Sequence, residues 1–150
     1  MASLSLAVAV AAYVLPVLAA AISDTRTLRI PNGVVAFLAA TYPLSALLLG
    51  HGGDIPLHAL AGLAVFAAAA CLFAVRAMGG GDVKLLAAVA LWAGPAGVEP
   101  LVLATALLGG VVALAILVLR RVRGLAPAPI PYGVPIALAA FLLAPSIFAA

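Results

Sequence analysis

The stretch Met78-Gly79-Gly80-Gly81-Asp82-Val83-Lys84 places a carboxylate and an ammonium group behind three glycines, in a chain with few other charges. Three consecutive glycines are unfavourable inside a helix because each loses much backbone entropy, so the stretch predicts a break between helices. Glycine also lets the backbone approach a neighbouring segment or a ligand closely. A carboxylate near hydrocarbon is costly to keep, which makes Asp82 a candidate functional residue.

The composition around this stretch indicates a membrane protein. Of the 150 residues, 68% are hydrophobic and only 7% are charged, which is far outside the range of soluble domains. A soluble fold of this composition would expose large apolar patches, whereas lipid accepts them. The net charge of +3 does not indicate nucleic-acid binding, because the basic residues lie in short gaps and form no stripe. We expect a single transmembrane domain over residues 1–150.

The apolar runs predict an all-α, polytopic protein with six transmembrane helices. A crossing needs roughly 20 apolar residues, and proline or glycine marks each break between runs. The expected spans are about 4–23, 33–50, 57–77, 83–94, 99–119 and 134–149. The fourth span has about half the length of a full crossing, so its glycine-rich start is expected below the membrane surface, against protein or a wet cavity.

The basic residues predict the orientation of these spans. With six crossings, all seven Lys and Arg residues fall in the three connections of one side: Arg26, Arg29, Arg76, Lys84, Arg120, Arg121 and Arg123. The positive-inside rule places these connections in the cytoplasm and both termini outside. The outer connections carry His51, Asp54, His58 and Glu99.

This topology brings a second carboxylate, Asp24, to the same side as Asp82. Two carboxylates that lie close in a poorly solvated site cannot both ionise easily, so one keeps a proton. Such a pair can activate water as an aspartic-protease dyad, in which one Asp accepts a proton and the other polarises the scissile carbonyl. The structural alternatives are an ion pair between Asp24 and Arg26, and a capping role for Asp82 at the start of the fourth span.

The remaining side chains provide weaker candidates for a catalytic or metal-binding site. His51 and His58 lie on the far side, Cys71 is expected to be a small core residue, and no Gly-x-Ser-x-Gly elbow is present. The His51-x-x-Asp54-x-x-x-His58 pattern predicts an interfacial loop rather than a zinc site, because Pro56 breaks the helical spacing.

Several residues receive structural roles. Asn32 is the expected N-cap of the second helix. Gly94-Pro95-Ala96-Gly97 predicts a turn, and the Pro-rich stretch 126–131 predicts a stiff spacer or one wall of a cleft. Three aromatic residues are expected to anchor the helices at the membrane interface: Tyr13, Trp92 and Tyr132.

Three ordered motifs resemble those of the type IV prepilin peptidases, the Gly-x-Gly-Asp class of membrane aspartic proteases. They are Gly79-Gly80-Gly81-Asp82-Val83-Lys84, the segment from Asp24 through Arg26 to Ile30-Pro31-Asn32, and Pro131-Tyr132-Gly133 before the last helix. The resemblance covers about residues 23–140. It implies that Asp24 and Asp82 are the catalytic residues and that Gly79 and Gly81 shape the loop presenting Asp82. Supporting motif positions are Arg26, Ile30, Pro31, Asn32 and Lys84.

The resemblance further implies an inner-membrane endopeptidase that cleaves the leader of pilin-like precursors on the cytoplasmic side, without metal or organic cofactor. The chain resembles the short peptidases of tight-adherence (Flp-type) pilus systems. The single Cys and short connections leave no room for the four-cysteine segment linked to N-methylation, so methyltransferase activity is not expected. The alternatives are a proton-coupled transporter that uses paired carboxylates, and a non-catalytic scaffold; a transporter should show repeated halves and a midplane site. The oligomeric state is left open.

Overall fold

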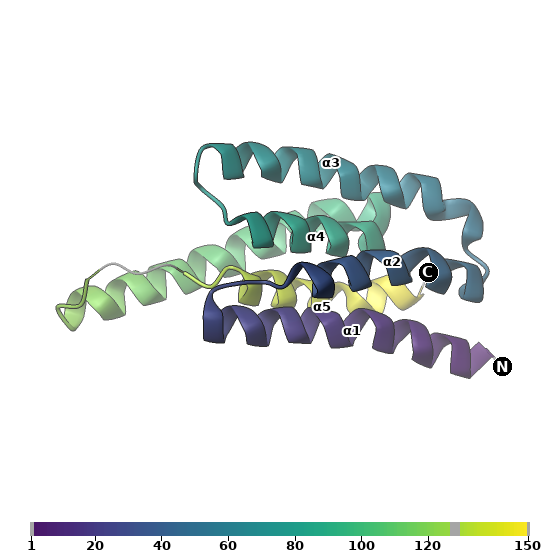
Figure 1. The fold of residues 1–150 in the computed structure, drawn as a ribbon, viewed down its shortest axis with the longest axis horizontal. Helices are drawn as coiled ribbons and strands as arrows, with labels where there is room; N and C mark the ends of the chain where they lie inside the picture. Colours follow the sequence, from purple (N-terminus) through teal and green to yellow (C-terminus); the bar gives the residue numbers. More distant parts are fainter. Residues whose placement is uncertain (1, 127–129, 150) are drawn as a thin grey trace.

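The computed structural model describes residues 2–126 and 130–149, and the regular structure in these ranges is helical (Figure 1). The prediction of an all-α fold is therefore confirmed. Four helices are long and apolar enough to cross a membrane, as expected of a multi-pass membrane protein. The last helix is also apolar but shorter. The elements are α1 (Ala2–Thr27), α2 (Asn32–Leu49), the 3-10 turn η1 (Gly52–Asp54), α3 (Ile55–Ala74), α4 (Gly80–Val122) and α5 (Gly133–Ala149).

Helix α4 is a helical hairpin rather than one straight rod. Gly94 has φ 66° and ψ −177°, a backbone conformation open essentially to glycine alone, and α4 turns back there (Figure 1). The two arms comprise residues 80–93 and 95–122. The predicted four-residue turn is thus confined to Gly94, because Pro95 already begins the second arm. With the two arms of α4 counted separately, the described residues form six α-helical segments, the same number as the expected spans. That each segment crosses the membrane remains a prediction.

A histidine from the neighbouring helix closes the break in α4. In a continuous helix the Leu91 carbonyl accepts a hydrogen bond from the N–H of residue 95, but Pro95 has no N–H. The Nδ1 atom of His58 in α3 lies 2.9 Å from the Leu91 oxygen and supplies the missing donor. The His58 ring also covers Gly94 so closely that a Cβ there would lie 2.4 Å from it.

The connections divide between the two ends of the bundle. The turns α1–α2 and α3–α4 and the long connection α4–α5 lie at one end, and the α2–α3 turn and both termini lie at the other (Figure 1). The basic residues of the three predicted inner connections therefore gather at one end, which we call the basic end. The opposite end, around His58 and Gly94, we call the aromatic end.

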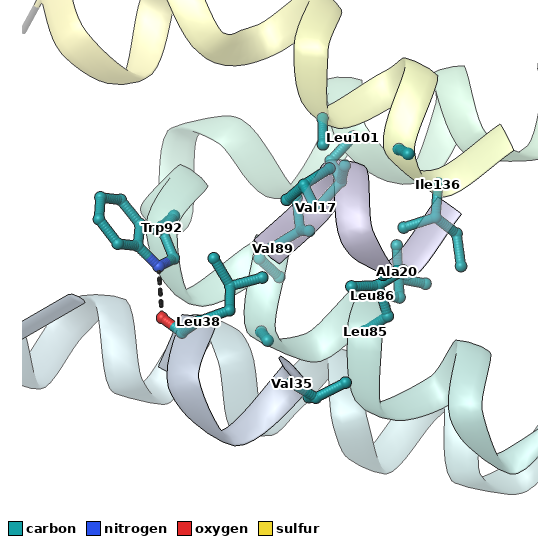
Figure 2. Close-up of a cluster of buried hydrophobic side chains, with 14 of the residues drawn as sticks. Val17, Ala20, Val35, Leu38, Leu85, Leu86, Val89, Trp92, Leu101 and Ile136 are labelled. Atoms are coloured by element: carbon teal, nitrogen blue, oxygen red, sulfur yellow. Dashed lines mark hydrogen bonds between the residues drawn. The ribbon is translucent and has the colours of Figure 1, made fainter. Parts of the chain in front are cut away.

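Aliphatic and aromatic side chains from all five helices fill the centre. Figure 2 shows part of this core, in which the Trp92 indole N–H donates a hydrogen bond to the Leu38 carbonyl over 2.8 Å. The Tyr13 hydroxyl likewise donates to the Ala140 carbonyl, and the Tyr13 and Trp92 rings lie 5.2 Å apart. Buried aromatic residues with polar groups need such partners, which stabilise the packing of α1, α2, α4 and α5.

Predictions about four single residues were wrong. Tyr13 and Trp92 are 0% and 3% exposed and belong to the core, not to the membrane interface. Cys71 is exposed on α3 because the small residues Ala61, Val65 and Ala69 already form the buried face of that helix. Asn32 begins α2 but does not cap it with a side-chain hydrogen bond, and Pro31 occupies the cap position instead.

Candidate active site

Asp24 and Asp82 line one cavity at the basic end. Asp24 lies near the end of α1 and Asp82 in the first turn of α4, and their side chains are only 5% and 9% exposed. The cavity has a volume of about 730 Å³. Its lining residues are Asp24, Leu28, Phe73, Ala74, Arg76, Ala77, Met78, Gly79, Asp82, Ile130 and Tyr132. The structure thus places the two carboxylates that were predicted from the sequence at one cavity.

The surroundings of Asp24 exclude one structural alternative. Among residues 2–126 and 130–149, the one side-chain pair within ion-pair distance is His51 with Asp54, so Arg26 does not pair with Asp24. Arg26 is exposed. The Asp24 Oδ2 atom instead accepts a 2.7 Å hydrogen bond from the backbone N–H of Gly133. Asp24 is therefore a buried carboxylate held by a neutral donor.

The glycines before Asp82 allow the backbone to wrap closely around its carboxylate. Gly79 is the N-cap of α4, and its backbone lies against the Asp82 carboxylate. A Cβ atom at Gly79 would lie 2.6 Å from Asp82 Oδ2, a distance that real contacts essentially never show. The capping alternative for Asp82 is thus part of its geometry, because an acid at the third helical position can reach back to the cap N–H.

The Ile-Pro-Asn segment packs directly on the glycine segment. A Cβ atom at Gly81 would lie 3.2 Å from the Ile30 Cβ atom, so one of the two segments would have to shift by a few tenths of an ångström. The Lys84 Nζ atom donates a 3.1 Å hydrogen bond to Asn32 Oδ1. Lys84 and Asn32 therefore join the start of α4 to the start of α2 on the exposed side of the site, and neither lines the cavity.

The segment before α5 completes the arrangement. Ile130 lines the cavity, which favours the cleft-wall role of the predicted stretch 126–131 over a plain spacer, and Tyr132, predicted as an interfacial anchor, lines the cavity as well. Residues 127–129 of that stretch lie outside the described residues. Gly133 is buried against Asp24. From the sequence, Gly133 was identified only as part of a motif, and its contact with Asp24 was not predicted. The signal for this contact is a glycine at the start of a helix, where free N–H groups are available to a carboxylate.

The polar residues of the aromatic end do not form a comparable site. Within the described part of the chain, no group of three or more His, Cys, Asp and Glu side chains is placed to hold a metal ion. His51 and Asp54 are exposed, while the His58 ring stacks on Tyr42 at 5.1 Å. The predicted loop covers only the first part of the pattern, because Pro56 stands in the first turn of α3 and His58 belongs to that helix.

Chemically, two buried carboxylates that face one open cavity can hold a water molecule between them. One can accept a proton from the water while the other, in its acid form, donates to a carbonyl oxygen. The described residues include no cation within ion-pair distance of either carboxylate, although Arg76 lines the same cavity.

Comparison with known proteins points in the same direction. A model of the type IV leader peptidase family matches residues 10–114, a range that includes both carboxylates. Searches of curated proteins and of solved structures found no significant match.

Proposed function

Because the chain belongs to the type IV leader peptidase family, we propose that it is an aspartic endopeptidase that uses Asp24 and Asp82 to remove the leader of pilin-like precursors. The observation that carries the proposal is the convergence of these two residues, far apart in sequence, on one cavity at one end of the bundle. Family membership supports a leader peptidase in general, and the cavity supports the choice of residues.

The proposed reaction is a hydrolysis with balanced proton transfers. The ionised carboxylate removes a proton from a water molecule, whose oxygen attacks the scissile carbonyl carbon, while the protonated carboxyl group donates to the carbonyl oxygen. The C–N bond then breaks, the amine nitrogen receives a proton, and the leader leaves with a new carboxylate. A pair of carboxylates that share one proton suits both roles.

The cavity is also suited to a substrate that becomes apolar next to its cleavage site. Leu28, Phe73, Met78 and Ile130 line it beside the two carboxylates. A precursor that continues into a hydrophobic helix would place its polar leader toward the basic end and its helix along the bundle. The gathering of basic connections at the same end supports a cytoplasmic position for the site in the inner membrane.

Substitution of the two carboxylates tests this proposal. The variants Asp24→Asn and Asp82→Asn should each lower cleavage of a synthetic precursor peptide by about 10²–10⁴-fold in detergent, because each removes a proton-transfer group. Asp54→Asn is the matched control at the aromatic end, where Asp54 is exposed and contacts only His51 among charged partners. It should cleave like the wild type.

The origin of the oxygen provides a second readout. In water labelled with oxygen-18, mass spectrometry should find one labelled oxygen in the carboxylate of the released leader. Full cleavage by either Asn variant, with correct membrane insertion, would remove the two carboxylates from the mechanism.

A further inference from the structure

The hydrogen bond between Gly133 and Asp24 joins the first helix of the chain to the last one. Asp24 lies in the last turn of α1, and Gly133 is the first residue of α5. The N–H groups of a helical first turn have no partner within the helix, so the Gly133 N–H is free to donate outward. It does so to Asp24 Oδ2 over 2.7 Å, and both residues are buried.

The packing around Gly133 is equally restrictive. A Cβ atom at this position would lie 2.8 Å from Asp24 Oδ2, 2.9 Å from its Cβ atom and 3.0 Å from its Cγ atom. Any side chain other than hydrogen must therefore displace the carboxylate or the start of α5. The hydrogen bond and the missing Cβ are separate observations, and both bear on the position of one carboxylate.

We propose that Gly133 is a positioning residue that fixes the Asp24 carboxylate in the orientation needed to activate water. This inference rests on the proposed function and adds to it a residue that the dyad itself does not include. The Gly133 donor fixes one oxygen of Asp24 to the backbone of α5, and the adjacent Tyr132 and Ile130 form the wall of the same cavity. The segment before α5 thus shapes the cavity and orients one of its acids.

A purely structural reading of the same bond makes a different prediction. If Asp24 only caps α5, loss of the contact should destabilise the protein and leave the turnover of the folded enzyme unchanged. If Gly133 positions Asp24, kcat should fall while KM stays nearly constant, because the substrate contacts remain but the proton acceptor is displaced.

The test uses the full-length protein and compares Gly133→Ala with Gly110→Ala. Gly133→Ala should lower kcat by about 10- to 100-fold with KM changed by less than about threefold. Gly110→Ala is the matched control in α4, since no atom lies within 4 Å of the added Cβ, and it should behave like the wild type. Equal kcat in Gly133→Ala and Gly110→Ala would overturn the inference.

A second variant separates the donor from the added bulk. Proline is favourable at the first position of a helix but lacks the N–H, so Gly133→Pro removes the hydrogen bond and favours the helix start. Its kcat should be lower than that of Gly133→Ala. If the kcat of Gly133→Pro instead equals that of Gly133→Ala, the hydrogen bond has no positioning role.

A spectroscopic readout keeps the inference testable without cleavage. In protein labelled with carbon-13 at aspartate, the infrared carboxyl band that disappears in Asp24→Asn should shift in Gly133→Ala and Gly133→Pro but not in Gly110→Ala. An unshifted band would overturn the positioning role. If the band shifts in the two Gly133 variants but the wild-type protein cleaves no precursor, the result contradicts the proposed function alone.

Discussion

At the basic end of the bundle, Asp24 and Asp82 are buried, whereas Asp54 at the aromatic end is exposed and lies 3.7 Å from His51. Glycine lies at a helix boundary at both ends, since Gly79 caps the start of α4 and Gly94 interrupts the same helix. At the aromatic end, however, His58 occupies the space over the break and satisfies its free carbonyl, and the cavity nearby has a volume of only about 100 Å³. At the basic end the break faces a cavity of about 730 Å³.

The comparison shows that residue type alone does not identify the site. Both ends combine an Asp with a glycine break and neighbouring aromatic or basic residues. What separates them is that the carboxylates of the basic end are buried without a cation and meet an open space, a costly arrangement that folding alone does not require. At the aromatic end His58 engages the carbonyl group that Pro95 leaves without a donor, as expected of a structural turn.

Outside the two carboxylates themselves, the largest effect on the basic end is expected from Gly79→Ala. The added methyl group would lie 2.6 Å from Asp82 Oδ2, so either the carboxylate or the loop must move. We expect kcat to fall by about 100-fold, comparable to the effect of a displaced catalytic group. Gly53→Ala at the aromatic end, where nothing lies within 4 Å, is the control and should leave kcat unchanged. Similar kcat values for both variants would erase the distinction between the two ends.

At the aromatic end, Gly94→Ala should affect stability instead of chemistry. An alanine at φ 66° and ψ −177° is strained, and its Cβ atom would meet the His58 ring at 2.4 Å. We expect a loss of about 1–3 kcal/mol in the free energy of unfolding. Thermal unfolding in detergent measures this change, with kcat determined on the fraction that remains folded. A normal unfolding temperature, or a kcat lowered in proportion to that of Gly79→Ala, would contradict a purely structural role.

The smallest effect is expected from Lys84→Ala. Lys84 is exposed, and its hydrogen bond to Asn32 supports the contact between two motif segments without reaching the cavity. Cleavage should fall by about two- to fivefold, in line with the modest worth of one exposed hydrogen bond. Asn32→Ala should have the same effect, and the double variant should be no worse than either single one. Complete inactivation of a folded Lys84→Ala protein would place Lys84 in the catalytic machinery.

Much of the basic end could be predicted from the sequence, because its determinants are local patterns or follow from the number of basic residues in each connection. Glycine runs mark breaks wherever they fall, and the distribution of Lys and Arg over alternate connections places Asp24 and Asp82 at one end. The family resemblance selected the same pair.

The remaining features depend on contacts between distant segments, which no local pattern encodes. Tyr13 belongs to the core because its hydroxyl finds the Ala140 carbonyl, 127 residues away. His58 closes the break at Gly94 across two helices, and Gly133 reaches Asp24 from the other end of the chain. Asn32 failed as a cap because its side-chain oxygen binds Lys84 instead.

The central claim is that Asp24 and Asp82 act as one unit on one water molecule, and a double-substitution cycle tests it most directly. Residues that act together are strongly non-additive, because removal of either one already disables the pair. If Asp24→Asn and Asp82→Asn each lower kcat by about 10³-fold, the double variant should also lose about 10³-fold. A loss near 10⁶-fold, the product of two independent effects, would contradict the shared mechanism.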